Sequence, residues 1–279
     1  MKFGIKMNGY HIPVLLNEVV KILDPKPGKR FVDCTLGGGG HAEALLAGGA
    51  EVLAIDRDPE AIQNSKGKSQ KLILRHGNFE NLIEIVREVG WDKVDGVLMD
   101  LGVSSHQLET DYRGFSFNKN AQLDMRMDPT AQIPTARDLI NVLNEGELAE
   151  LFWKYGEDRY SKQIAKEIKR SNIETTDDLA KAILRVRHDR GRTHPATRVF
   201  QALRMAVNDE LNSLKSALPQ AWEILKPEGV LAVISFHSLE DRIVKNFMNN
   251  NQKPIISTKD EVEFNPRARS GKLRFARRQ

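Results

Sequence analysis

The sequence predicts an α/β protein built on a parallel, doubly wound sheet that is interrupted by a helical insertion. Over residues 30–100, short apolar runs rich in β-branched residues alternate with segments of helical period. After Asp100 the alternation stops, and from about residue 135 to 215 the apolar residues follow only the helical period. A further apolar run at residues 230–235 indicates that the sheet then resumes.

The individual elements follow from these periods and from the residues that end them. Pro25 and Pro27 end a first helix, and Thr-Thr-Asp-Asp at residues 175–178 is a predicted helix cap. Residues 227–229 form a predicted turn, and Ser238 with Asp241 resembles a capping box. The predicted strands are residues 30–34, 51–55, 71–75, 94–99, 230–235 and, as a final edge strand, 272–276. The predicted helices are residues 12–23, 41–47, 59–65, 80–89, 136–143, 145–155, 159–171, 176–187, 196–218, 219–225 and a last one ending at 248.

These patterns divide the chain into two domains. We expect a discontinuous sheet domain of residues 1–110 and 211–279, and a helical insertion of residues 111–210. Residues 101–128 have no period, but their aromatic residues and methionines argue against disorder. A long aperiodic segment of this kind is usually functional.

The stretch from Phe31 to His41 has the pattern of a strand, a tight glycine turn and a helix start. Its four consecutive glycines, residues 37–40, allow a ligand to approach the backbone, and the helix start offers unpaired N–H groups. The next strand ends in Asp56, which is placed to bind ribose hydroxyls. The unit is therefore predicted to bind a nucleoside cofactor. The alternative is a glycine turn without a ligand.

Two cofactors remain open from this stretch. Gly37, Gly39 and Ala42 fit the loose dinucleotide pattern, so NAD is one of them. S-adenosylmethionine is favoured, because Asp33 ends the first strand, where a carboxylate neutralises an amino group but repels a pyrophosphate. The pair Asn78-Phe79 after the third strand suits an adenine edge and face. With Asp100, polar or aromatic groups follow four strands at one edge of the sheet.

Composition is that of a globular protein: the 279 residues are 40% apolar and 29% charged, with a net charge of +4. No apolar run approaches the roughly 20 residues of a membrane helix, and no signal peptide is evident, so we expect a cytoplasmic protein without a membrane partner. The single cysteine, Cys34, excludes an internal disulfide, and no metal site is predicted. Residues 265–279 contain six Lys or Arg and no acid, which favours a phosphate-rich partner over a merely solvated face.

Several residues near the strand ends are candidates for chemistry. An exocyclic base amine is not basic, so acceptors that grip its N–H groups would help it attack a methyl group. Asp100, the Leu101 carbonyl, Ser104 and Ser105 are such acceptors. Ser235 and His237 follow the fifth strand, where His237 either acts as a base or positions a pyrimidine. The alternative is a core or helix-capping histidine. For Asp100 the alternative is a structural strand-end carboxylate.

A second basic group lies around the start of the predicted helix 196–218. Its members are Arg185, Arg187, Arg190, Arg192, Arg198 and Arg204. These side chains would hold a nucleic-acid backbone, and Phe115, Phe117 and Phe200 would stack on unpaired bases. The alternative for each phenylalanine is ordinary core packing.

Eight blocks of the sequence, in order over nearly the whole chain, resemble the bacterial RsmH (MraW) family. The most specific are Asp-Met-Arg-Met-Asp-Pro at 124–129 and Ser-Phe-His-Ser-Leu-Glu-Asp-Arg at 235–242. The others are Gly-Gly-Gly-His at 38–41, Ile-Asp-Arg-Asp at 55–58, Asp-Leu-Gly-Val-Ser-Ser at 100–105, Arg-Gly-Phe-Ser-Phe at 113–117, His-Pro-Ala-Thr-Arg at 194–198 and Asn-Pro-Arg-Ala-Arg-Ser at 265–270.

The resemblance implies a Rossmann-like, class I S-adenosylmethionine-dependent methyltransferase that modifies the N4 amine of a cytidine in the decoding centre of 16S rRNA. Its substrate would be the small ribosomal subunit, and a homodimer is plausible from the family. The family's cofactor positions carry over onto Gly39, Gly40, His41, Asp56, Phe79, Asp100 and Gln107. The sequence departs from the family pattern at His106, where the family usually has a proline next to the position of Gln107. The stretch 250–264 is also shorter than in many relatives.

We therefore expect catalysis by Asp100, with Ser235 and His237 beside it, in a sheet domain whose insertion recognises RNA. The target base would be unstacked toward Asp100. Two alternatives from other classes are an NAD-dependent oxidoreductase and a non-catalytic RNA-binding module. A thermal-shift titration with S-adenosylmethionine and with NAD distinguishes the methyltransferase from the oxidoreductase. Substitution of Asp100 distinguishes it from the RNA-binding module, because only an enzyme would lose turnover.

Overall fold

The computed structural model describes residues 13–188, 194–249 and 252–279, which fall into two compact units. The first unit comprises Met1–His106 and Leu211–Gln279, and the second comprises Gln107–Glu210. The first contains the predicted sheet and the second the predicted helical insertion, so the fold class is confirmed. Each unit is described by itself.

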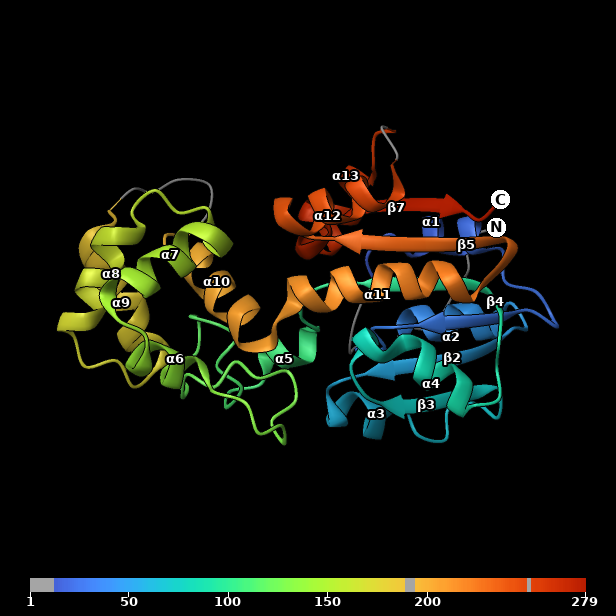
Figure 1. The fold of residues 1–279 in the computed structure, drawn as a ribbon, viewed down its shortest axis with the longest axis horizontal. Helices are drawn as coiled ribbons and strands as arrows, with labels where there is room; N and C mark the ends of the chain where they lie inside the picture. Colours follow the sequence, from blue (N-terminus) through green and yellow to red (C-terminus); the bar gives the residue numbers. More distant parts are fainter. Residues whose placement is uncertain (1–12, 189–193, 250–251) are drawn as a thin grey trace. The chain divides into compact units, whose positions relative to one another are not determined.

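A seven-stranded sheet with the order β3-β2-β1-β4-β5-β7-β6 forms the first unit (Figure 1). The strands are β1 (Arg30–Asp33), β2 (Glu51–Asp56), β3 (Leu72–His76), β4 (Val94–Asp100), β5 (Leu225–Ser235), β6 (Ile255–Ile256) and β7 (Lys272–Arg277). β1 to β5 pair in parallel, whereas β7 is antiparallel to β5 and β6. The prediction that β7 is the edge strand is wrong, because the two-residue β6 lies outside it.

Alternate residues of the strands build two apolar layers, one on each face of the sheet. Val32 and Val97 face a core shared with α4 (Leu82–Glu88), α11 (Glu210–Ile224) and α12 (Ser238–Met248). Phe31 and Leu98 face a core shared with α1 (Leu16–Leu23), α2 (Gly40–Ala47) and α13 (Lys259–Phe264). The remaining elements are α3 (Pro59–Ser65), α5 (Ser105–Glu109) and the 3-10 helices η1 (Phe79–Asn81) and η2 (Pro266–Ser270). Burial on both faces explains why the strands read as continuous apolar runs.

The second unit is helical. Its helices are α6 (Ala136–Val142), α7 (Glu145–Gly156), α8 (Ser161–Arg170), α9 (Thr176–Val186) and α10 (Thr197–Asn208). Their buried faces carry the apolar residues that the helical period predicted, such as Phe152, Ile164 and Leu203. The predicted cap at residues 175–178 is confirmed, and its N-cap is Thr175: the Thr175 hydroxyl accepts from the Asp178 N–H, and the Asp178 carboxylate accepts from the Thr175 N–H.

Several predicted boundaries are wrong. The single helix expected over residues 196–218 is two helices, because Asp209 has a left-handed φ of +49° and ends α10. The separate helix expected over residues 219–225 is also wrong, because α11 continues through Pro219 to Ile224. The turn expected at 227–229 lies within β5 as an irregularity, with Glu228 at φ +63°. The helix expected from residue 12 begins at Leu16. The predicted turn at Asn250 and Asn251 lies outside the described residues.

Candidate functional site

Three neighbouring parallel strands bring three carboxylates to one edge of the sheet. β1 ends at Asp33, β2 at Asp56 and β4 at Asp100, and β1 lies between the other two strands. The carboxyl ends of parallel strands share one edge, which is where α/β sheets bind ligands. This edge of the first unit is the candidate functional site.

The segment between β1 and α2 is hydrogen-bonded to all three strand ends. The Thr35 N–H donates to Asp33 Oδ1 at 3.1 Å, and the Asp100 N–H donates to Thr35 Oγ1 at 2.7 Å. The Gly37 N–H donates to Asp56 Oδ2 at 2.7 Å. Thr35 therefore ties β1 to β4, a role that sequence reasoning missed because a lone threonine before glycines gives no distinct signal.

The glycines of this segment have different reasons to be glycine. Gly37 and Gly39 have φ values of +49° and +82°, which side chains disfavour, and Gly39 is the N-cap of α2. At Gly40 a Cβ would lie 2.2 Å from Pro13 Cγ, so packing excludes a side chain there. The predicted approach of a ligand is thus best supported at Gly37 and Gly39.

His41 extends the site from the first turn of α2. Its Nε2 lies 3.4 Å from Asp100 Oδ2, and the side chain is only 6% exposed. Four polar atoms here are buried and have no hydrogen-bond partner in the part of the chain that the structure describes: Asp33 Oδ2, Asp100 Oδ1 and both ring nitrogens of His41. Buried polar groups are rarely left unpaired, because each costs about 1–3 kcal/mol. The cluster therefore indicates a bound ligand that supplies partners.

Two of the carboxylates hold their protons unusually tightly. Burial raises the pKa of Asp33 to about 6, against a smaller lowering by His41 and the Thr35 N–H. Burial likewise raises the pKa of Asp56 to about 6, although the N–H groups of Asp58 and Gly37 stabilise its charge. A cation in the site would favour ionisation of both groups.

Of the two residues predicted to contact the adenine, Phe79 packs partly against the core, whereas the Asn78 side chain has hydrogen-bond partners within the protein. Phe79 lies in η1, directly after β3, and packs in part against the core. The Asn78 side chain accepts from the Glu80 N–H at 3.3 Å and donates to Ser213 Oγ at 3.1 Å, so it caps η1. Gln107 is buried in α5 and belongs to the second unit.

Ser235 and His237 follow β5, and the structure gives both of them local partners. Ser235 Oγ donates to the Lys272 carbonyl at 3.4 Å. His237 is the N-cap of α12, where Nδ1 accepts from the Glu240 N–H at 3.4 Å and the Glu240 carboxylate accepts from the His237 N–H at 3.3 Å. The predicted capping box of Ser238 and Asp241 is therefore wrong by one position. Asp241 instead accepts from Arg274 on β7 at 2.6 Å.

The predicted RNA-facing arginines of the second unit have acidic or carbonyl partners. Arg190 and Arg192 lie outside the described residues. Arg187 pairs with the buried Asp158 at 3.2 Å, and Arg204 forms two bonds to Glu210, at 2.8 and 2.9 Å. The others are Arg185, which pairs with Glu167 at 2.9 Å, and Arg198, which donates to the Glu157 carbonyl at 2.7 Å. Much of this charge therefore stabilises the unit itself.

The three phenylalanines predicted to stack on bases also contact other groups of the protein. Phe115 and Phe200 are 7% and 5% exposed, which is the alternative of core packing. Phe117 is half-buried and stacks on His194, with ring centroids 4.3 Å apart. An aromatic of the second unit thus already has a stacked partner within the protein.

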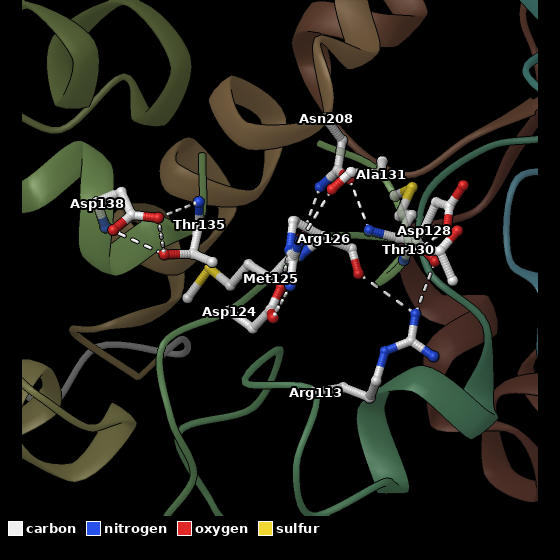
Figure 2. A network of polar contacts seen from close by, with 11 residues as sticks. Arg113, Asp124, Met125, Arg126, Asp128, Thr130, Ala131, Thr135, Asp138 and Asn208 are labelled. Carbon is white, nitrogen blue, oxygen red and sulfur yellow. Dashed lines mark hydrogen bonds and ion pairs between the residues drawn. The ribbon is translucent and has the colours of Figure 1, made fainter. Parts of the chain in front are cut away.

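The Asp-Met-Arg-Met-Asp-Pro block forms a dense polar network in the second unit, which we call the polar frame (residues 124–131 with Arg113 and Asn208; Figure 2). Arg126 donates to both carboxylate oxygens of Asp124, at 2.8 and 2.7 Å, and to the Ala131 carbonyl at 2.9 Å. Asn208 spans the block: its amide donates to the Met125 carbonyl and accepts from the Met127 N–H, both at 2.7 Å. These bonds hold Met125 at a left-handed φ of +60°. The block is an architectural device in this unit.

Among the described residues, no group of three or more His, Cys, Asp or Glu side chains is arranged to hold a metal ion. No helix in that part of the chain is both long and apolar enough to cross a membrane.

The strand order and the helical insertion define the fold of a class I S-adenosylmethionine-dependent methyltransferase. Comparison with known proteins then identifies the family. Residues 8–253 match the model described as the MraW methylase family, and the chain belongs to this family.

Curated relatives are similar over nearly their full length. The chain is 42% identical to the "Ribosomal RNA small subunit methyltransferase H" of Heliobacterium mobile, over 98% of this chain and 100% of that protein. It is 46% identical to the protein of the same name from Deinococcus radiodurans, over 96% of this chain and 89% of that one. An rRNA methylase structure from Streptococcus thermophilus is 12% identical, with a TM-score of 0.44 over 95% of this chain and 94% of that one.

Proposed function

We propose that this protein transfers a methyl group from S-adenosylmethionine to the N4 amine of a cytidine in the decoding centre of 16S rRNA, within the small ribosomal subunit. Membership of the MraW methylase family supports the proposal, as do relatives named for methylation of small-subunit rRNA. The structural observation that carries it is the set of three strand-end aspartates, two of which, Asp33 and Asp100, each have a buried oxygen without a hydrogen-bond partner in the described part of the chain.

The charge of the site fits this cofactor better than a dinucleotide. When bound, S-adenosylmethionine supplies a methyl group activated by a sulfonium centre, and it also carries an ammonium group. Asp33 Oδ2 and Asp100 Oδ1 are buried acceptors without donors in the described part of the chain, so they match N–H donors and positive charge. A pyrophosphate would bring negative charge to the same carboxylates and be repelled. The site therefore favours the methyl donor over NAD.

Each cofactor contact can be assigned to a residue of the chain. Asp33 would bind the ammonium group, and Asp56, held by two N–H donors, would bind the ribose hydroxyls. Phe79 would stack on the adenine. The remaining proposed contacts are the backbone of Gly39, Gly40 and His41, and the side chains of Asp100 and Gln107.

The chemistry at the acceptor amine is assigned to the end of β4. The lone pair of a cytidine N4 is delocalised into the ring, so the amine needs acceptors that orient its N–H groups. Asp100 Oδ1, the Leu101 carbonyl, Ser104 and Ser105 are the acceptors proposed for this task. Ser235 and His237 remain proposed catalytic residues, and for His237 the capping bonds favour a supporting role.

The second unit, residues 111–210 in the predicted division, is proposed to recognise rRNA together with the basic segment 265–279. Its exposed Trp153, 62% accessible on α7, and Arg198 are the described groups best suited to base and phosphate contacts. The cytoplasm, where ribosomal subunits are assembled, is the proposed compartment, and a homodimer is the proposed state. Sedimentation velocity tests the latter.

The function is tested by methyl transfer from labelled cofactor to small subunits that lack the modification, followed by nucleoside analysis. Label in N4-methylcytidine supports cofactor, substrate and acceptor atom together. Label in another nucleoside contradicts the acceptor assignment. No label, with the cofactor shown to bind by calorimetry, contradicts the substrate.

A further inference from the structure

The Asn-Pro-Arg-Ala-Arg-Ser block at residues 265–270 is a fixed platform on the first unit. It forms η2, directly before β7. Ala268, at its centre, is fully buried in the core that also holds Leu15 and Leu273. A Cβ on Gly271, the residue after the block, would lie 2.8 Å from Val14 Cγ1, so the chain is also tightly packed at this point. A side chain that starts from this platform begins at a well-defined position.

Arg267 reaches from the platform to the segment after β4. Its Nη1 donates to the hydroxyl of Ser105, which lies 162 residues earlier in the chain and is buried at the start of α5. A guanidinium is always charged and has planar donors in fixed directions, so this bond is charge-assisted and directional. The neighbouring Arg269 is exposed instead. Arg267 therefore fixes the Ser105 side chain from the η2 side.

The residues on either side of Ser105 contact two other elements. His106 Nε2 lies 2.6 Å from Glu60 Oε2, in the first turn of α3. A Cβ built on Gly37 would lie 3.5 Å from Ser104 Cβ, so Ser104 packs on the glycine segment. Three consecutive residues are thus held by three separate parts of the first unit.

The sheet order shows what this segment crosses. α3 follows β2, and α5 follows β4, while β1 lies between β2 and β4. A contact between α3 and α5 therefore passes across the carboxyl end of β1, where Asp33 lies. We call residues 104–106 the strap.

We propose that Arg267 and Glu60 are positioning residues for methyl transfer, which act through Ser105 and His106 to hold the strap across the candidate site. The inference rests on the proposed function, because the strap carries two of the proposed acceptors for the cytidine amine. Serine hydroxyls rotate freely unless they are held, and a displacement of about 1 Å at a reacting group can lower a rate on the order of 10²-fold. Tethers at Ser105 and His106 prevent such a displacement.

The test measures kcat, the KM for small subunits and the cofactor Kd for Arg267→Ala, Arg267→Lys and Glu60→Gln. We expect kcat to fall about tenfold or more for Arg267→Ala, with a subunit KM within about twofold, and partial recovery for Arg267→Lys. Arg30 and Glu51 provide matched controls, since they pair at 3.1 Å at the amino ends of β1 and β2, the opposite edge of the sheet. Arg30→Ala and Glu51→Gln should leave kcat unchanged.

A double-mutant cycle separates action through Ser105 from other roles. If Arg267 acts through Ser105, adding Arg267→Ala to Ser105→Ala causes no further loss of kcat. A raised subunit KM with unchanged kcat in Arg267→Ala would show an RNA contact and overturn the proposal, as would additive losses. Failure of the unmodified protein to transfer methyl to any subunit would instead contradict the proposed function. Calorimetric cofactor binding and thermal melting of every variant identify those that fail to fold.

Discussion

The strand-end site of the first unit and the polar frame of the second both bury charged and polar side chains, but they pair them differently. In the polar frame, Arg126 meets both oxygens of Asp124, and Asn208 bonds to the backbone on two sides. In the site, Asp33 and Asp100 each keep a buried oxygen without a donor among the described residues. Groups paired within the chain hold the architecture, whereas groups left unpaired mark where a ligand completes the structure. The two regions should therefore respond to substitution in opposite ways.

The largest expected effect is on turnover at Asp100. Asp100→Asn replaces an acceptor oxygen with an N–H donor or a neutral carbonyl, so the cytidine amine loses its orienting partner. We expect kcat to fall about 10²–10³-fold while the protein stays folded, because the Thr35 bond is made by the Asp100 backbone. Single-turnover methyl transfer measures the change. Unchanged turnover would contradict the role of Asp100.

The second expected effect is a gain of stability at Asp33. Its pKa is about 6 in the folded protein and ordinarily 3.8, so the folded state binds more protons and loses stability as pH rises from about 4 to 6. Asp33→Asn removes this loss. The variant should be more stable than the parent by up to about 3 kcal/mol at pH 8 and equally stable at pH 4, yet bind the cofactor more weakly.

Urea unfolding without ligand, at both pH values, measures the difference. Asp92→Asn, at an exposed position of the same unit, is the control and should show neither change. If Asp33→Asn is instead less stable than the parent protein at pH 8, the Asp33 carboxylate stabilises the fold as the paired groups of the polar frame do, and the contrast fails.

The third expected effect is a loss of stability in the polar frame. Asn208→Ala leaves the Met125 carbonyl and the Met127 N–H without their partner, which should destabilise the second unit by about 2 kcal/mol. Cofactor affinity should stay within about twofold. Asn141→Ala, at an exposed position of α6, should change stability by less than about 0.5 kcal/mol. A loss of cofactor affinity in Asn208→Ala with stability unchanged would remove the contrast between the two regions.

The smallest expected effect is a pH dependence of cofactor affinity. A cationic ligand prefers ionised Asp33 and Asp56, whose pKa values burial raises to about 6. Affinity should therefore increase by up to about tenfold per pH unit for each coupled carboxylate below pH 6, and level off above pH 7. Calorimetry in two buffers of different ionisation enthalpy would also detect proton release near pH 6. A flat profile would show that neither carboxylate meets positive charge.

Much of the fold was predictable because its signals are local. Runs of β-branched residues and glycine turns indicated the parallel strands. The Thr-Thr-Asp-Asp stretch at residues 175–178 indicated the start of α9. The strand-end aspartates were found for the same reason, since topology alone places the ends of parallel strands at one edge.

The remaining features depend on contacts between distant residues. The end of α10 at Asp209 has no local sequence signal, because an aspartate tolerates helical and left-handed backbone alike. The edge position of β6 depends on its pairing with β7 and is likewise not visible in the local sequence. The pairing of Arg267 with Ser105 spans 162 residues, and the role of Thr35 depends on which strand lies beside β1. The sequence left the capping role of His237 open and placed the capping box one position too late, because histidine is an uncommon N-cap.

The interruption of the sheet after β4 also affects the order of events on the ribosome that makes this chain. β4 pairs with β5, and Gly96 is the partner of Val230. Because the insertion lies between these strands in the sequence, it is synthesised before β5 becomes available to pair with β4. At about 5–20 residues per second, this delay lasts on the order of ten seconds. During that interval the growing edge of the sheet is unpaired, while the second unit, which is continuous in sequence, is complete and free to fold. The nascent chain would therefore finish its inserted unit before it closes the sheet that holds the candidate site.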